Sequence, residues 1–194
     1  PASQNNGSFS GLTLGGDYNY TVTDANGCEF TDIFTINEAV APELEIVPND
    51  ICYDDAVGLT LTANVIAGGD GNYEYSLNGG PFITNNVFSG LAPGDYTIDI
   101  RDGNGCTDSE SITIDPELSV VASAPNITAC EADTEITVTA AGGDGNYVYA
   151  VVADGATPAD SDFAPTNPIT GVVAGDYDVY VRDNGGASGY CEAS

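Results

Sequence analysis

The chain has 194 residues, of which 30 are Asp or Glu and 2 are Lys or Arg, so its formal net charge at pH 7 is −28. Binding to nucleic acid or to an anionic membrane surface needs basic patches, which two cations cannot build, so neither is an expected partner. Hydrophobic residues make up 42% of the chain, which is too many for a disordered acidic tail and predicts a folded protein helped by salt or divalent cations.

Catalysis and membrane insertion are also disfavoured by composition. The chain has no His, and its two basic residues are Arg101 and Arg182. Ser-His-Asp and Cys-His arrangements therefore cannot be assembled. Pairs of carboxylates arise by chance among so many acids and indicate nothing. No apolar run approaches the ~20 residues of a membrane span. We expect a protein that is not an enzyme and does not insert into membranes.

Two motifs recur along the chain and predict repeats. A Gly-Asp-Tyr step that leads to a Cys is found at 16–28, 94–106 and 175–191, and its tyrosines are 78 and 81 residues apart (96 − 18 and 177 − 96). The motif Gly-Gly-Asp-Gly-Asn-Tyr occurs at 68–73 and again at 142–147. Self-similarity at this period predicts tandem modules.

We place the module boundaries at the Pro-Glu steps, which suit short stiff linkers. Residues 1–40 are then the C-terminal part of one repeat, and 41–116 and 117–194 are whole repeats. The first residues look like the middle of a repeat, so we expect the chain to be part of a longer protein.

Alternating apolar and polar residues predict strands at 59–65, 96–100, 136–140 and 177–181. No segment has the periodicity of a capped helix. Asn-Gly pairs within 24–27 and 102–105 predict tight hairpins that join the last two strands of a repeat. Many short strands separated by turns predict an all-β sandwich or barrel.

Five cysteines without a histidine or a Cys-x-x-Cys pair favour disulfides in an oxidising compartment over a zinc site. They are Cys28, Cys52, Cys106, Cys130 and Cys191. Pairing within repeats gives Cys52–Cys106 and Cys130–Cys191. Pairing across linkers gives Cys28–Cys52 and Cys106–Cys130. We favour the first set, because each whole repeat then holds one bond, although the sequence does not decide between them.

The segments 68–77, 90–106 and 142–149 resemble the SprB repeat. This resemblance implies a long surface or secreted protein of gliding and related Bacteroidota, exported by type IX secretion and used in adhesion and gliding. Residues 90–100 are also similar to the Leu-x-Pro-Gly-x-x-Tyr segment of fibronectin type III domains. That similarity implies tandem immunoglobulin-like β-sandwich modules in a linear array, with structural tyrosine corners at Tyr18, Tyr96 and Tyr177. The resemblance transfers no catalytic residue.

Calcium is the one candidate cofactor, because oxygen ligands alternate in the predicted hairpin turns. The candidate ligands are Asp24, Asn26, Asp102, Asn104, Asp183 and Asn184. An ordinary Asx-type turn explains the same pattern, and Thr113 stands where an EF-hand would need Glu. A second candidate is the set of linker acids, which comprises Glu43, Asp115 and Glu117.

Aromatic and basic side chains offer a few further candidates. The pairs Tyr73/Tyr75 and Tyr147/Tyr149 each share one strand face and suit either sugar stacking or core packing, and Tyr180 is the better candidate for an exposed ring. We expect the two arginines to pair with nearby acids such as Asp99 or Asp102.

These features together predict a structural or adhesive spacer of an extracellular or bacterial cell-surface protein or filament. Neighbouring repeats of the same protein are the expected partners. A module that binds polysaccharide or another surface protein, and a fibre subunit that assembles by strand addition, are the alternatives.

Overall fold

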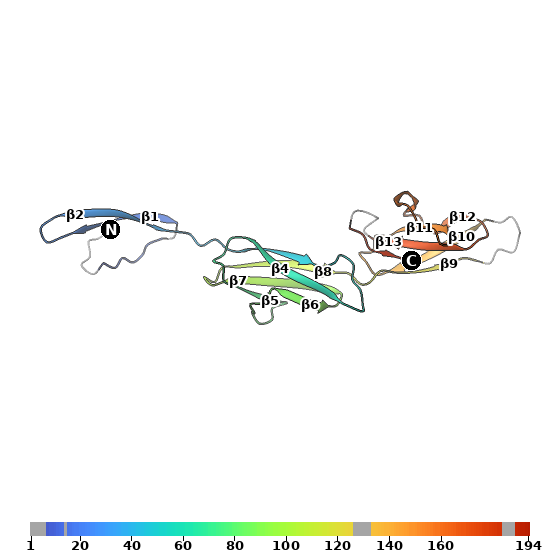
Figure 1. Cartoon of the computed structure of the whole chain (residues 1–194), viewed down its shortest axis with the longest axis horizontal. Coiled ribbons are helices and arrows are strands. Elements are labelled where there is room, and N and C mark those ends of the chain that lie inside the picture. Colours follow the sequence, from blue (N-terminus) through green and yellow to red (C-terminus); the bar gives the residue numbers. More distant parts are fainter. Residues whose placement is uncertain (1–6, 14, 126–132, 184–188) are drawn as a thin grey trace.

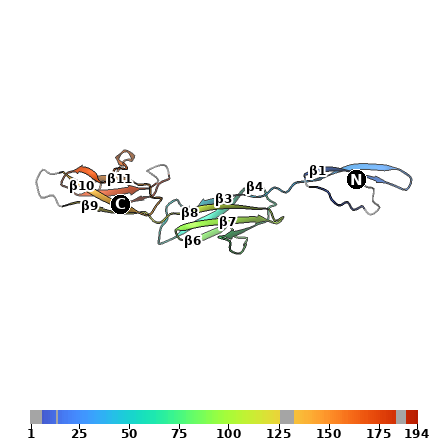
Figure 2. The same cartoon turned by 180° about the vertical axis from the view of Figure 1, so that it is seen from behind.

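The computed structural model describes residues 7–13, 15–125, 133–183 and 189–194, and within these ranges the only helix is a single 3₁₀ turn. The strands form several small antiparallel sheets, so the all-β expectation is confirmed. Three sets of strands follow one another along a line, with the β1–β2 hairpin at one end and β9–β14 at the other (Figures 1 and 2). No helix in the described ranges is long and apolar enough to cross a membrane.

The first set is a hairpin of β1 (Gly16–Thr23) and β2 (Glu29–Ile36). Its turn falls on the predicted Asn-Gly pair, and Gly27 there has a φ of 84°, which a glycine adopts without strain. Three apolar side chains of this hairpin, Val22, Phe30 and Phe34, are each about 60% exposed.

The second set, called the β3–β8 unit, contains two three-stranded antiparallel sheets, β3-β4-β6 and β5-β7-β8. Its strands are β3 (Glu43–Pro48), β4 (Leu59–Ala67), β5 (Tyr73–Leu77), β6 (Val87–Leu91), β7 (Gly94–Asp102) and β8 (Thr107–Ile114). Alternate residues of β4 and β7 meet in one core, where Leu61, Ile98 and Ile100 are fully buried. Each such side chain contributes roughly 1.5–3 kcal/mol of burial free energy. Two sheets around one core are consistent with a β-sandwich.

The third set, called the β9–β14 unit, also has two three-stranded sheets, β12-β10-β9 and β11-β13-β14. Its elements are β9 (Ser119–Ser123), β10 (Thr134–Ala141), β11 (Val148–Ala153), the 3₁₀ turn η1 (Asp160–Asp162), β12 (Ile169–Val172), β13 (Tyr177–Arg182) and β14 (Glu192–Ala193). Val138 of β10 and Val181 of β13 are buried, as the expected alternation of each strand requires.

Strand pairs repeat the same register from set to set. Tyr18 pairs with Phe34 in the first set, as Tyr96 pairs with Ile112 in the second. No described sheet combines strands from two sets. The module boundaries after residues 40 and 116 stay predictions.

Tyrosine hydroxyl groups at matching positions donate to backbone carbonyl groups just upstream. Those of Tyr96 and Tyr177 donate to the residue four positions before, Ala92 O at 2.8 Å and Val173 O at 3.2 Å. The Tyr18 hydroxyl donates to Thr13 O at 3.0 Å.

The Tyr-x-Tyr pairs lie in or beside the cores. Tyr75 is buried, and Tyr73, Tyr147 and Tyr149 are half-buried. Tyr180, the candidate for an exposed ring, is half-buried too, and its hydroxyl lies 3.4 Å from Ala156 O.

Candidate functional site at the Cys52–Cys191 junction

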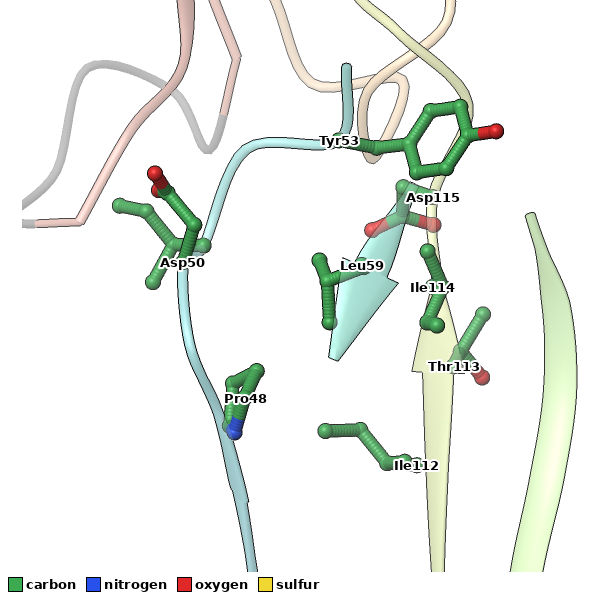
Figure 3. A pocket seen from close by; sticks show the side chains of 9 residues that line it. Pro48, Asp50, Tyr53, Leu59, Ile112, Thr113, Ile114 and Asp115 are labelled. Atoms are coloured by element: carbon green, nitrogen blue, oxygen red, sulfur yellow. The ribbon is translucent and has the colours of Figure 1, made fainter. Parts of the chain in front are cut away.

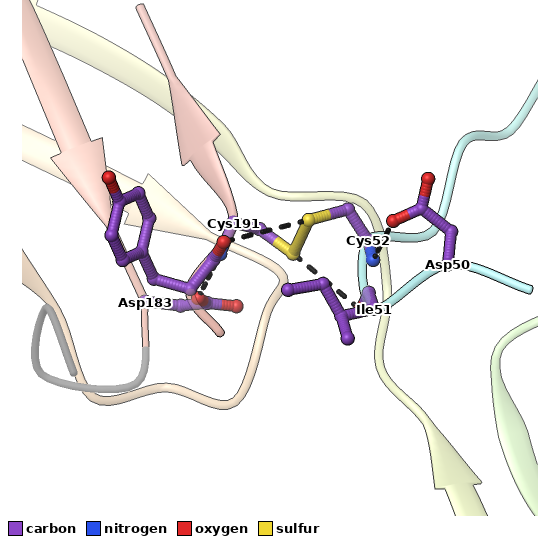
Figure 4. Close-up of a disulfide and its surroundings, with 6 residues drawn as sticks. Asp50, Ile51, Cys52, Asp183 and Cys191 are labelled. Atoms are coloured by element: carbon purple, nitrogen blue, oxygen red, sulfur yellow. Dashed lines mark hydrogen bonds between the residues drawn. A yellow bond between two sulfur atoms is a disulfide. The ribbon is translucent and has the colours of Figure 1, made fainter. Parts of the chain in front are cut away.

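A disulfide joins the β3–β8 unit to the β9–β14 unit. Cys52 lies in the loop between β3 and β4, Cys191 immediately precedes β14, and their Cα atoms are 5.5 Å apart although 139 positions separate them in sequence. Figure 4 shows the two cysteines meeting from opposite sides of the junction. The disulfide itself indicates a non-reducing environment.

This bond corrects the connectivity expected from sequence. The pairings Cys52–Cys106, Cys130–Cys191 and Cys28–Cys52 are all wrong, because Cys52 and Cys191 bond to each other. Cys28 and Cys106 are free cysteines, and Cys130 lies outside the described residues. Pairing was expected within a repeat or between neighbours in sequence, whereas the end-to-end arrangement brings a loop of one unit to the hairpin end of the next.

Carboxylates fix the backbone on both sides of the bond. Asp50 Oδ1 accepts from Cys52 N at 3.1 Å, and Asp183 Oδ1 accepts from Cys191 N at 2.6 Å. Asp183 N in turn donates to Cys191 O at 3.1 Å. Close to the bond, Cys191 Sγ lies 3.6 Å from Ile51 O (Figure 4). A local turn therefore fixes the backbone of each cysteine independently of the disulfide.

A further contact spans the same junction without a covalent bond. Glu117, one of the linker acids, accepts a hydrogen bond from Asp55 N at 3.2 Å. Another linker acid, Glu43, is the first residue of β3. The linker that contains Glu117 thus contacts the loop that carries Cys52.

Acidic side chains crowd the junction. The pKa of Asp115 is raised above its ordinary value of 3.8, mainly by partial burial and then by the negative charges of Asp144, Asp183 and Asp95. The field at this point is therefore unfavourable to added negative charge and would be relieved by salt or cations.

The hairpin-turn acids serve as backbone acceptors. Asp102 Oδ1 accepts from Asn104 N at 3.0 Å and from Cys106 N at 2.8 Å. Asp24 makes the same two bonds, and the amides of Cys28 and then Asn26 lower its pKa. These are Asx-type turns.

Asp102 has one oxygen that these turn bonds do not use. The residue is 6% exposed, and its Oδ2 is buried without a hydrogen-bond partner among the described residues.

Calcium binding stays a prediction. Asn184 lies outside the described residues. Within the described ranges, no group of three or more Asp, Glu, Cys or His side chains is arranged to hold a metal ion.

A small pocket of about 170 Å³ adjoins the Cys52 loop. It lies between the segment that carries Pro48 and Asp50 and strand β8, which carries Ile112 and Ile114 (Figure 3). Tyr53 also lines it, and its pKa is raised by partial burial and then by Asp55. The volume is below the range of about 300–1,000 Å³ that small-molecule sites occupy.

An arginine stack stabilises the hairpin end that carries Cys191. The Arg182 guanidinium lies 3.7 Å from the ring centre of Phe163 and 4.1 Å from that of Tyr190. It also bonds Asp160 at 2.7 Å and Glu192 at 2.6 Å while its side chain is 8% exposed. Burial opposes its charge, but these two carboxylates outweigh that effect and raise its pKa.

The second arginine occupies a more exposed setting. Arg101 pairs with Glu74 at 2.6 Å and lies 4.2 Å from the centre of the Phe82 ring. Neither arginine uses the expected partners Asp99 or Asp102. The observed partners come from other strands and loops, so sequence proximity gave no signal for them.

The chain was also compared with known proteins. No protein-family model matches it, and no curated protein matches its sequence. The resemblance to the SprB repeat therefore stays a prediction.

Proposed function

We propose that this chain is a structural spacer of a long secreted or cell-surface protein, built from tandem immunoglobulin-like β-sandwich repeats. The observation that carries the proposal is the Cys52–Cys191 bond, which joins one strand unit to the next. Two units connected by a linker alone can change their relative angle more easily than two units with a second connection. A second covalent connection removes most of that freedom, which is what a rod that sets a fixed distance requires.

Three features support the interpretation of the chain as tandem repeats. Tyr18 and Tyr96 have matching cross-strand partners, and their hydroxyl groups make matching upstream bonds. The same upstream bond recurs at Tyr177. Such bonds are typical of the tyrosine corner in immunoglobulin-like domains. The in-line order of the three sets is the arrangement that a spacer needs (Figure 1).

Charge and redox chemistry support an extracellular setting. Disulfides persist in oxidising compartments. A net charge of −28 keeps neighbouring molecules apart, and extracellular salt screens the repulsion within each one.

Small-angle X-ray scattering of the oxidised chain tests the proposal. We expect the distance distribution of a rod with one preferred length. The double variant Cys52→Ser/Cys191→Ser should keep its β-sheet content but show a broader distribution, because the linker alone then sets the angle. A compact particle with its units side by side would refute the spacer function.

A second candidate function, assembly by strand addition, is favoured by the β1–β2 hairpin. Its Val22, Phe30 and Phe34 are each about 60% exposed, whereas the matching strands β7 and β8 are covered by a second sheet. Sedimentation velocity over a range of concentrations tests it. We expect association that Phe30→Ser/Phe34→Ser abolishes and Val121→Ser, an exposed apolar residue of β9, leaves unchanged. A concentration-independent monomer would exclude this candidate.

A further inference from the structure

Three hairpins of the chain hold a cysteine in the same backbone setting. In each, the cysteine N–H donates to an aspartate Oδ1, at 2.9, 2.8 and 2.6 Å in chain order. The cysteine carbonyl accepts from the N–H of that aspartate, at 3.0, 2.9 and 3.1 Å. The pairs are Asp24–Cys28, Asp102–Cys106 and Asp183–Cys191. The longer third hairpin therefore leaves its cysteine at the same position of the ladder.

The bonding state of these three cysteines differs. Cys191 is bonded, and its partner Cys52 belongs to the preceding unit and not to its own. Cys106 is free and half-buried, and Cys28 is free and exposed.

The linker that precedes the β3–β8 unit, which carries Cys106, docks on that unit as the linker that precedes the β9–β14 unit docks on the unit that carries Cys191. Gly69 N donates to Val40 O at 2.9 Å, and Gly143 N donates to Pro116 O at 2.7 Å. The glycine before each, Gly68 with φ +70° and Gly142 with φ +81°, lets the linker backbone approach so closely that a Cβ would collide with a linker carbonyl oxygen.

The end of the β3–β8 unit that carries Cys106 is also hollowed. A pocket of about 480 Å³ is lined there by linker residues 37–40, by Gly69 and by Asn104 of the Cys106 hairpin. The preceding linker is therefore fixed beside the Cys106 hairpin by the same kind of backbone contact as beside the Cys191 hairpin, and the pocket leaves open space next to the Cys106 hairpin.

We propose that Cys106 is the acceptor for the loop cysteine of a preceding repeat, the residue equivalent to Cys52, so that disulfides run from each repeat to the next. This inference rests on the proposed tandem-repeat function. Bond formation is thiol–disulfide exchange with an external disulfide oxidant. The two protein thiols lose two electrons and two protons to become one disulfide, and the oxidant is reduced to two thiols. Cys28 has the backbone setting for the same role.

Insertion of a second copy of residues 43–116 between Pro116 and Glu117 of the full chain tests this. The insertion keeps a Pro-Glu step at both seams and gives Cys106 of the inserted copy a preceding Cys52. After oxidation and alkylation, intact mass should show two disulfides and three free thiols. One disulfide with five free thiols would overturn the proposal.

Matched variants distinguish this relay from bonds within a repeat. Cys106→Ser in the inserted copy should lower the count to one disulfide, and so should Cys52→Ser in the first copy. Cys106→Ser in the first copy should leave both bonds intact. Loss of a bond in that last variant would mean pairing within the repeat and would refute the relay.

Failure of the relay is separable from failure of the spacer function. Scattering from the duplicated chain should show a rod lengthened by one unit, and this length does not depend on which cysteines pair. A longer rod without the second disulfide would overturn the relay alone, whereas a compact duplicated chain would overturn the spacer.

Discussion

Replacement of both Cys52 and Cys191 by serine removes the covalent bond between the β3–β8 and β9–β14 units. Serine keeps the backbone N–H groups that donate hydrogen bonds to Asp50 and Asp183. The local turns therefore remain, and the variant measures the effect of the disulfide alone. The bond closes a loop of 139 residues. In the chain-entropy model, opening a loop of this length costs about 5 kcal/mol of stability.

Native disulfides typically contribute about 2–4 kcal/mol, because the unfolded chain keeps some structure. For a chain of this size, each kcal/mol shifts the melting temperature by about 2–4 °C. We therefore expect the double variant to melt roughly 5–15 °C below the oxidised parent.

Differential scanning calorimetry of the oxidised parent and the double variant measures this shift. Cys106→Ser is the matched control, since Cys106 is free and its replacement should move the midpoint by no more than about 1 °C. Equal melting temperatures for parent and double variant would refute the reasoning, because a bond absent from solution cannot constrain the unfolded chain.

Three further outcomes are expected in melting experiments. Arg182→Lys keeps the charge but loses the contact with two aromatic rings and the hydrogen bonds to two carboxylates, so it should lower the free energy of unfolding by about 1–3 kcal/mol. Arg101→Lys, at the more exposed pair, should lower it by no more than about 1 kcal/mol. The reverse order would contradict the stabilising role of the Arg182 stack. The pKa of Asp115 is raised in the folded protein, so its negative charge destabilises the fold above that pKa. Asp115→Asn should therefore raise the melting temperature at pH 7. The increase should shrink as the pH falls and vanish below the ordinary pKa of 3.8, where the carboxyl group is protonated in both states. An unchanged midpoint at pH 7 would contradict the destabilisation of the Asp115 charge by burial and by the neighbouring acids. Sodium chloride from low to physiological concentration should raise the midpoint by screening the charge of −28, and a fall would mean that attractive ion pairs dominate.

Sequence alone determined the features that depend on neighbours along the chain. Alternation along 59–65 and 96–100 placed β4 and β7, because side chains of successive residues point to opposite faces of a sheet. The Asn-Gly steps placed two hairpin turns, because the required positive φ is a local property of the chain. The Asp side chains of those turns were recognised as Asx acceptors for the same reason.

Tertiary structure decided the features that join distant residues. Four other cysteines are possible partners of Cys52 in sequence terms, and only the end-to-end placement of two units brings its loop to Cys191. Arg182 likewise finds Asp160 and Phe163 because η1 and its flanking residue pack against β11, the sheet neighbour of β13. Sequence patterns report the period of side chains along one strand, whereas these contacts depend on how separate strands and units are placed in space.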